Sequence, residues 1–190
     1  MRPCGAFQSP DGKAIPETAT RDPIARARSP ARICHACTVR VSAKADYAVR
    51  AAIELAGADQ VHPTKGDGIA RAQQIPVKFL ENILADMRHA GLVSSRRGQD
   101  GGYWLAKPAD EITVADVIRA VEGPLASVRG ERPEKTSYPG AAEPLQRVWI
   151  ALRTSLRQVV EQVTIADIAS GRLPPQIAKL ADEPESWTTR

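Results

Sequence analysis

The chain has 190 residues, of which 43% are hydrophobic and only 4% aromatic. These values are typical of a globular domain with an aliphatic core and a small appendage. The net charge of +4 favours an anionic partner. No window holds the roughly 18 consecutive apolar residues of a membrane span, and the first residues lack the apolar stretch of a secretory signal. We therefore expect a cytoplasmic protein.

Residues 1–38 differ in composition from the rest of the chain. They hold five of the 15 prolines and show no helix or strand periodicity, so we expect a disordered extension. All three cysteines, Cys4, Cys34 and Cys37, lie here. Together with His35 they make only a weak zinc motif, and no metal site is predicted.

Two interpretations of this extension are open. If Val39 were the initiator methionine, the chain would begin a few residues before the first helix. This favours a misassigned translation start. The alternative is a basic arm that reaches the minor groove of DNA, using the arginines of the segment. These are Arg21, Arg26, Arg28 and Arg32.

Two helical segments follow. From Ala45 to Ala56 the apolar residues recur at steps of three and four, and Ser42 can cap the first turn. A shorter helix is expected to end near Gln73, with Thr64 or Asp67 as its cap.

A third helix is expected to begin at Pro76 and to end before Gly91. Its apolar stripe predicts burial of one side. That stripe consists of Val77, Leu80, Leu84 and Met87. The opposite face is polar and carries Lys78, Glu81, Asn82 and His89.

After this helix come the strand-like stretches "LVSSR" and "YWLA", joined by a glycine-rich turn. Three helices followed by a two-stranded wing predict a mainly α winged helix-turn-helix domain over 39–124. Arg96 and Arg97 would meet phosphate or A·T-rich edges, while Gly98, Gly101 and Gly102 allow positive φ and close approach. The alternative is a surface hairpin with solvated charges.

A further helix lies within residues 111–123, where Thr113 and Asp116 form a capping-box pattern. Its expected apolar stripe is Val114, Val117, Ile118 and Val121. Residues 125–143 lack periodicity and predict a linker loop.

Residues 144–173 are expected to form a dimerisation region, because apolar residues there alternate steps of four and three as in a coiled-coil seam. The seam consists of Leu145, Trp149, Leu152, Leu156, Val159 and Val163. The alternative is a helix packed on its own domain. A second cap at Thr164 to Asp167 opens a final turn closed by Gly171, and 174–190 is expected to be a flexible tail.

Three stretches resemble the Rrf-two family of bacterial transcription regulators: "VRVSAKADYAVRAAIELA", the run from "IPVKFLENILADMRHAGLVSS" through "EITVADVIRAVEGPL", and "LQRVWIALR". The resemblance implies a homodimer that binds palindromic operators in double-stranded DNA, with repression as the expected outcome. It places base contacts on Lys78, Glu81 and Asn82, and a wing contact on Arg97. Backbone contacts would come from Arg40, Ser42 and Tyr47.

Many members of that family hold an iron-sulphur cluster through three cysteines in the linker loop. Residues 39–190 contain no cysteine, so no cluster is predicted, although Asp46 matches a carboxylate ligand of some members. The signal would then be another effector or a partner protein. An enzyme is not expected, because His35, His62 and His89 lack a catalytic pattern. The rival interpretation is a winged-helix protein-interaction module without specific DNA binding.

Overall fold

The computed structural model describes residues 41–188. The predictions for residues 1–38, including the three cysteines, and for Val39 and Arg40 lie outside the described residues. Within 41–188, no helix combines the length and apolar character that crossing a membrane requires.

The first helix, α1, spans Ala43–Glu54. As predicted, Ser42 caps it: the Ser42 hydroxyl accepts a hydrogen bond from the backbone N–H of Ala45 at 3.1 Å. Small residues of α1 are fully buried, which lets other helices approach its backbone closely. These residues are Ala45, Ala48, Ala51 and Ala52.

Helices α2 (Gly66–Gln73) and α3 (Val77–His89) follow. The predicted cap of α2 is wrong, because Lys65 occupies the N-cap without a side-chain bond. Thr64 instead pairs its backbone with the wing, donating to and accepting from Tyr103 at 2.9 and 2.8 Å. Helix α3 ends as predicted, with Gly91 at a φ of +73°.

The prediction for the buried face of α3 needs one correction. Leu80, Leu84 and Met87 are buried, but Val77 is 45% exposed. Val77 is the first residue of α3, so no preceding turn covers it. Ile83, which the predicted stripe omits, is fully buried.

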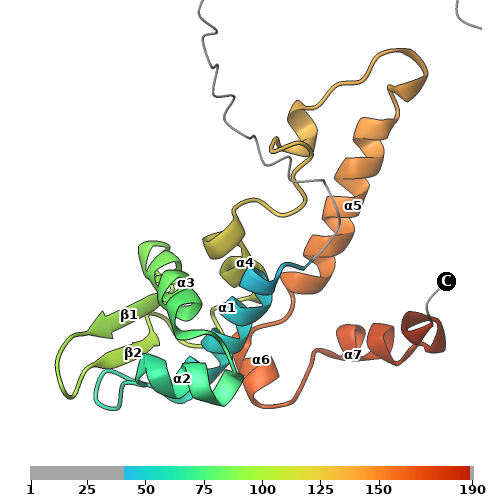
Figure 1. The fold of residues 1–190 in the computed structure, drawn as a ribbon. Helices are drawn as coiled ribbons and strands as arrows, with labels where there is room; N and C mark the ends of the chain where they lie inside the picture. Colours follow the sequence, from blue (N-terminus) through green and yellow to red (C-terminus); the bar gives the residue numbers. More distant parts are fainter. Residues whose placement is uncertain (1–40, 189–190) are drawn as a thin grey trace, which may run out of the picture. The chain divides into compact units, whose positions relative to one another are not determined.

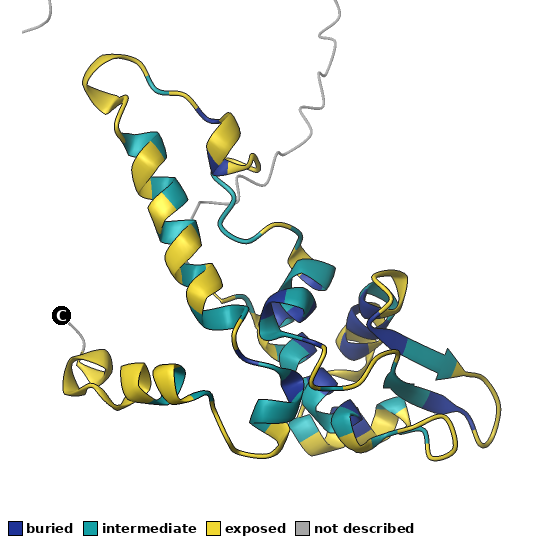
Figure 2. Ribbon diagram, turned by 180° about the vertical axis from the view of Figure 1, so that it is seen from behind, coloured by how far each residue is buried: buried dark blue, intermediate teal, exposed yellow. Residues whose placement is uncertain are grey.

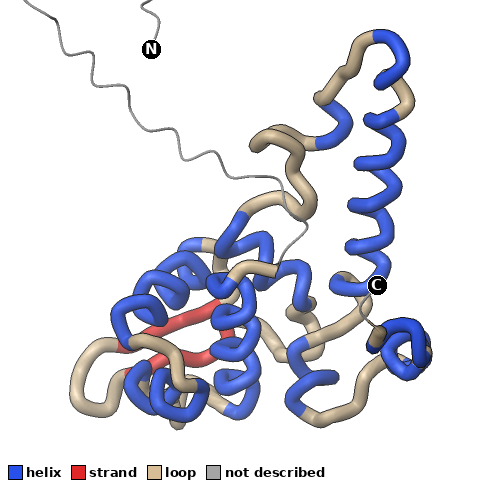
Figure 3. The backbone as a smooth tube through the Cα atoms, turned by 45° about the vertical axis from the view of Figure 1, so that its right-hand side comes forward, coloured by secondary structure: helices blue, strands red, loops and turns tan. Residues whose placement is uncertain are grey.

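Two antiparallel strands, β1 (Val93–Arg96) and β2 (Gly102–Leu105), form the predicted wing, with Ser94 opposite Trp104. Strand β1 packs against α3, and β2 packs against a 3-10 turn that extends α1. Figures 1 and 3 show this hairpin beside the helices of the domain. The winged helix-turn-helix fold is therefore confirmed.

Helix α4 (Val114–Glu122) has the predicted capping box between Thr113 and Asp116. Its buried residues are Ala115, Val117 and Val121, whereas Val114 and Ile118 are only half-buried. Helix α4 packs against α1 and α3 and completes the core. None of the buried hydrophobic residues of 41–188 is aromatic, which agrees with the mainly aliphatic core that the composition predicts.

The linker 125–143 contains two 3-10 turns, at Pro133–Lys135 and Gly140–Ala142, and leads into α5 (Leu145–Val160). No residue of α5 is buried, and Figure 2 shows the contrast with the dark-blue core of the winged domain. Leu145, Trp149, Leu152, Leu156 and Val159 are half-buried along one side.

The placement of Val163 on the long helix is wrong. Helix α5 ends at Val160, and Val163 is 6% exposed because it packs in the winged domain. Its carbonyl accepts from the N–H of Val114 at 2.9 Å, and the N–H of Ile165 donates to the carbonyl of Ile112 at 2.9 Å. This pairing returns the chain to the domain after α5.

Helix α6 (Ile165–Ala169) carries the second capping box, from Thr164 to Asp167, and ends before Gly171 at a φ of +68°, both as predicted. Where a flexible tail was expected, the structure has α7 (Pro175–Asp182) and a 3-10 turn at Pro184–Trp187. Pro175 at the first helical position favours this start.

Candidate nucleic-acid interface

Helices α2 and α3 form a helix-turn-helix whose turn is held by side chains from α1. Gln74 adopts the left-handed conformation, with φ 53° and ψ 41°, and turns the chain between the two helices. The Arg50 guanidinium donates to the carbonyl of Gln73 and, through Nε, to its side-chain oxygen at 3.0 Å. Gln73 in turn donates to Glu54 at 2.5 Å. These bonds join the C-terminal end of α2 to α1.

Helix α3 presents the three predicted base-contacting residues on its outward face. The side chains of Lys78 and Glu81 are 97% and 58% exposed, with 3.9 Å between Nζ and Oε2, and Asn82 is also exposed. The opposite face of the same helix is buried, so these side chains point away from the core. They combine a cation, an acceptor and an amide, which suit guanine or phosphate, cytosine N4 and adenine respectively.

Lys44 fixes α3 in a way that the sequence pattern did not reveal. Its Nζ lies 2.7 Å from a carboxylate oxygen of Asp86 on α3 and donates at 2.7 Å to the carbonyl of Val121 on α4. One side chain of α1 therefore joins three helices. The signal in the sequence is only a lysine in the first turn of α1.

Of the three residues predicted to contact the DNA backbone, Arg40 lies outside the described residues. Ser42 is engaged within the protein, since its hydroxyl caps α1 and also donates to Glu122. A phosphate contact by Ser42 stays a prediction, and it requires phosphate to replace Glu122.

Tyr47 is half-buried and held by two neighbours. Its ring meets Phe79 of α3 edge to face, with 5.7 Å between centroids, and the Arg50 guanidinium lies 5.3 Å from its centroid. The hydroxyl forms no hydrogen bond with any residue of 41–188. It is therefore available to donate to a phosphate while the ring links α1 to α3.

The wing places both predicted arginines in solvent. Arg96 donates to the carbonyl of Asp100 at 3.1 Å across the turn, and Arg97 lies exposed at its tip. Arg88, at the end of α3, contacts Ser95 of β1 at 3.5 Å and adds a cation between α3 and the wing. Arg88 was not predicted as a site residue. It follows Glu81 by seven residues, which is two helical turns, so the spacing places both on one face of α3.

At two of the three wing glycines the backbone lies so close to another backbone segment that a side chain would not fit. Gly98 has a φ of +112°, as predicted. A Cβ at Gly101 would lie 2.2 Å from the carbonyl oxygen of Arg96, and one at Gly102 would lie 2.7 Å from that of Thr64. The prediction of positive φ is therefore wrong for Gly101 and Gly102. Glycine is required at these two positions because a Cβ would collide with a neighbouring backbone.

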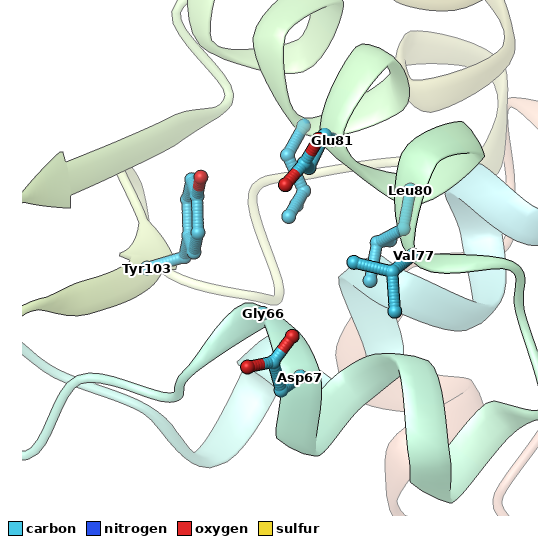
Figure 4. Close-up of a pocket in the computed structure, with 7 residues that line it drawn as sticks. Gly66, Asp67, Val77, Leu80, Glu81 and Tyr103 are labelled. Carbon is cyan, nitrogen blue, oxygen red and sulfur yellow. The ribbon is translucent and has the colours of Figure 1, made fainter.

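A shallow pocket of about 190 Å³ opens between α2, the first half of α3 and β2. It is lined by Gly66, Asp67, Val77, Leu80, Glu81, Leu84 and Tyr103. Figure 4 shows Val77 and Leu80 on the α3 side, with Tyr103 and Asp67 around the opening. Glu81 lines this pocket, so the pocket borders the exposed face of α3.

The linker is fastened to α5 by polar contacts. Gln146 donates to the carbonyls of Glu134 and Thr136 at 3.1 and 2.6 Å, and Trp149 donates to the Tyr138 hydroxyl at 3.0 Å. Arg153 binds both oxygens of Glu134 at 2.6 and 2.5 Å. This hydrogen-bonded pair lowers the pKa of the Glu134 carboxyl to about 2.

Comparisons with known proteins agree with this arrangement. The Rrf2 family model, described as an iron-dependent transcriptional regulator, matches residues 41–171. An HTH-type transcriptional regulator of Mycobacterium tuberculosis is 50% identical over 145 residues, covering 76% of this chain and 90% of that protein. CymR of Bacillus subtilis, also an HTH-type transcriptional regulator, is 35% identical over 133 residues, covering 70% and 91%.

Two solved structures share the fold. The structure of CymR, the global cysteine regulator of B. subtilis, matches with a TM-score of 0.58 and 34% identity, over 70% of this chain and 97% of that chain. The structure of T. potens IscR matches with a TM-score of 0.55 and 30% identity, over 80% and 93%. These relatives are regulators and not enzymes. The chain therefore belongs to the Rrf2 family, the Rrf-two family that its sequence resembles, and is a DNA-binding transcriptional regulator.

Proposed function

We propose that this chain represses transcription by binding a palindromic operator as a homodimer. The observation that carries the proposal is the two-sided character of α3. Its apolar side is buried in the core, while Lys78, Glu81 and Asn82 are exposed together on the other side. A helix of this kind, beside a wing with Arg96 and Arg97, is suited to the major groove.

The exposed α5 supports the homodimer. Five apolar side chains lie along one side of this helix, yet none of its residues is buried by the rest of the described chain. A second copy of the same helix would cover that side. Because one winged helix contacts a short half-site, two-fold symmetry would double the site and make it palindromic.

The test is selection of duplexes from a random library with the purified full-length protein, followed by binding measurements on the enriched sequence. We expect a palindrome, a protein dimer on the duplex, and affinity that falls steeply and linearly on a log-log plot against salt as counterions are released. A module that binds only proteins would enrich no sequence. Transcription in vitro from a promoter carrying the enriched site then distinguishes repression from activation.

We further propose that the protein works without an iron-sulphur cluster, although the family model is described as iron-dependent. Cluster irons are held mainly by cysteine thiolates, and residues 39–190 contain none. In this proposal the effector is another molecule or a partner protein.

The cluster proposal is tested on protein purified with and without oxygen. We expect a colourless protein whose DNA affinity does not change when an iron chelator is added. Stoichiometric iron with a visible absorption band would contradict the proposal and would direct attention to Cys34, Cys37 and Asp46.

A further inference from the structure

The exposed valine at the start of α3 has no role in the core. Val77 is 45% exposed, although the apolar spacing of α3 predicts that it is buried. It is one helical turn before Glu81, and residues four apart lie side by side on a helix surface. Val77 therefore borders the polar face that carries Lys78 and Glu81.

The surroundings keep one side of Val77 open. Gly66, the first residue of α2, lines the same pocket and has no side chain, and a Cβ there would point towards the Tyr103 ring, 3.5 Å away. Leu80 lies beside Val77 on the α3 side of the pocket, and Tyr103 of the wing lies on the far side (Figure 4); the buried Leu84 also lines the pocket. Among the lining residues, Val77 is thus the exposed aliphatic side chain, beside the acidic side chains of Asp67 and Glu81.

The chemistry of the major groove limits what this surface can meet. The base edges there present hydrogen-bond donors and acceptors, with a single apolar group, the C5 methyl of thymine. Valine offers no hydrogen bond, so a polar edge pressed against it would lose water without compensation. A thymine methyl has no such penalty and would gain from leaving water.

We infer that Val77 is a specificity-determining residue that selects thymine at one position of each half-site through contact with its C5 methyl. This inference rests on the proposed operator binding. Glu81 one turn later accepts hydrogen bonds, so the same edge of α3 combines an apolar contact with a polar one.

The experiment compares thymine with deoxyuridine, which lacks only the methyl. Each thymine of the enriched duplex is replaced in turn, in both half-sites, and affinity is measured for the full-length protein. One methyl-sized group corresponds to about 0.8 kcal/mol, so we expect about a fourfold loss per half-site and about a 15-fold loss for the symmetric replacement. The loss should occur at one thymine position only.

Substitutions at Val77 then test whether this residue contacts the sensitive thymine. Val77→Ala should bind the thymine duplex more weakly and should distinguish thymine from deoxyuridine less than the native protein does, because its shorter side chain makes less contact with the methyl, whereas Val77→Ile should keep the distinction. Val61→Ala is the matched control, because Val61 is an exposed valine (74%) in the loop before α2. It should distinguish the two duplexes as the native protein does.

The outcomes separate the two proposals. If no sequence is enriched from the library, operator binding itself is wrong and this inference fails with it. If a sequence is enriched but no thymine is sensitive to loss of its methyl, or if Val77→Ala stays equally sensitive, operator binding stands and the role of Val77 is wrong.

Discussion

At the scale of single residues, some side chains of α3 hold the helix on the domain, and others are predicted to contact DNA bases. Two side chains of α3 attach it to α1: Asp86 pairs with Lys44, and Phe79 packs on Tyr47. Within the part of the chain that the structure describes, Lys78, Glu81 and Asn82 form no hydrogen bond or ion pair outside α3. Changes at the reading residues should therefore alter DNA binding while leaving the stability of the fold nearly unchanged.

The first prediction concerns Glu81 and Arg97. Glu81→Ala should relax base preference at one operator position, since loss of a good base contact costs about 1 to 3 kcal/mol. Arg97→Ala should weaken binding to all sequences and reduce the salt dependence, because phosphate contacts carry no sequence information. Selection and salt titration of each variant measure both effects. Equal preference and equal affinity in both variants would show that the reading surface lies elsewhere.

The second prediction concerns the hydroxyl of Tyr47. Tyr47→Phe keeps the ring packed on Phe79 and removes only the group that can donate to phosphate. We expect unchanged thermal stability and a loss of binding of roughly 0.5 to 3 kcal/mol, the range for one hydrogen bond to a neutral or charged partner. Titration with the enriched duplex measures it, and an unchanged affinity would remove Tyr47 from the interface.

At the scale of elements, the wing and the linker each depend on contacts that a single substitution can break. The tip of the wing brings the backbones of Arg96 and Gly101 into close contact, and the loop before α2 does the same with Gly102. The linker depends on α5 side chains that bind its backbone. Both elements therefore rely on contacts with neighbouring segments.

The third prediction tests the wing. Gly101→Ala would place a Cβ 2.2 Å from the Arg96 carbonyl oxygen, so the turn must open. We expect a stability loss of about 1 to 3 kcal/mol, as for overpacking elsewhere, and weaker DNA binding. Gly68→Ala in α2 is the control, because its Cβ would meet nothing within 4 Å. Equal thermal unfolding of both variants would contradict the close contact.

The fourth prediction tests the linker through pH. Hydrogen bonding to Arg153 lowers the pKa of Glu134 from 4.5 to about 2. A carboxyl with a lowered folded pKa stabilises the protein fully above its unfolded pKa, and the contribution is lost as the pH falls from 4.5 towards 2. Glu134→Gln should thus lower the melting temperature at pH 6, and this difference should shrink below pH 3.

The control for this measurement is Glu131→Gln, since Glu131 is an exposed acid of the same linker without an ion pair to the described residues. Its effect on the melting temperature should be small and should not vary over that pH range. A Glu134→Gln effect that is independent of pH would show that the pair with Arg153 does not form.

At the scale of the whole molecule, α5 is an amphipathic helix whose apolar side is only half-buried by the rest of the described chain, whereas its C-terminal end is attached to α4. Glu161 joins α5 to α4 by accepting from Arg157 at 2.9 Å and from Arg119. These hydrogen bonds lower the pKa of the Glu161 carboxyl. A second copy that packs on α5 would therefore be positioned by the winged domain.

The fifth prediction tests that packing. Leu152→Glu places a charge in the middle of the apolar side of α5 and should convert the proposed dimer to a monomer, because an unpaired charge cannot be buried there. Thr154→Glu adds the same charge on the exposed opposite side and should leave the dimer intact. Light scattering after gel filtration gives the mass of each. A native protein that is already monomeric would contradict the homodimer.

The sequence by itself determined the helices and the wing of residues 43–169, whereas α7 stands where a flexible tail was expected. Helix starts at Ser42, Thr113 and Thr164 follow local capping chemistry, and the wing follows from two short strands around glycines. Lys78, Glu81 and Asn82 were predicted to share a face because periodicity within one helix is a local property. The resemblance to the family assigned roles to those residues only as expectations, and their base contacts stay predictions.

The tertiary structure decided what depends on segments far apart in the chain. Val163 follows the seam spacing, yet its backbone pairs with Val114 and its side chain is buried in the domain. Val77 follows the core spacing, yet it is the first residue of α3 and is 45% exposed, because no preceding turn covers it. Periodicity reports which side of one element is apolar, but burial also requires a neighbour, and only the packed fold supplies that neighbour.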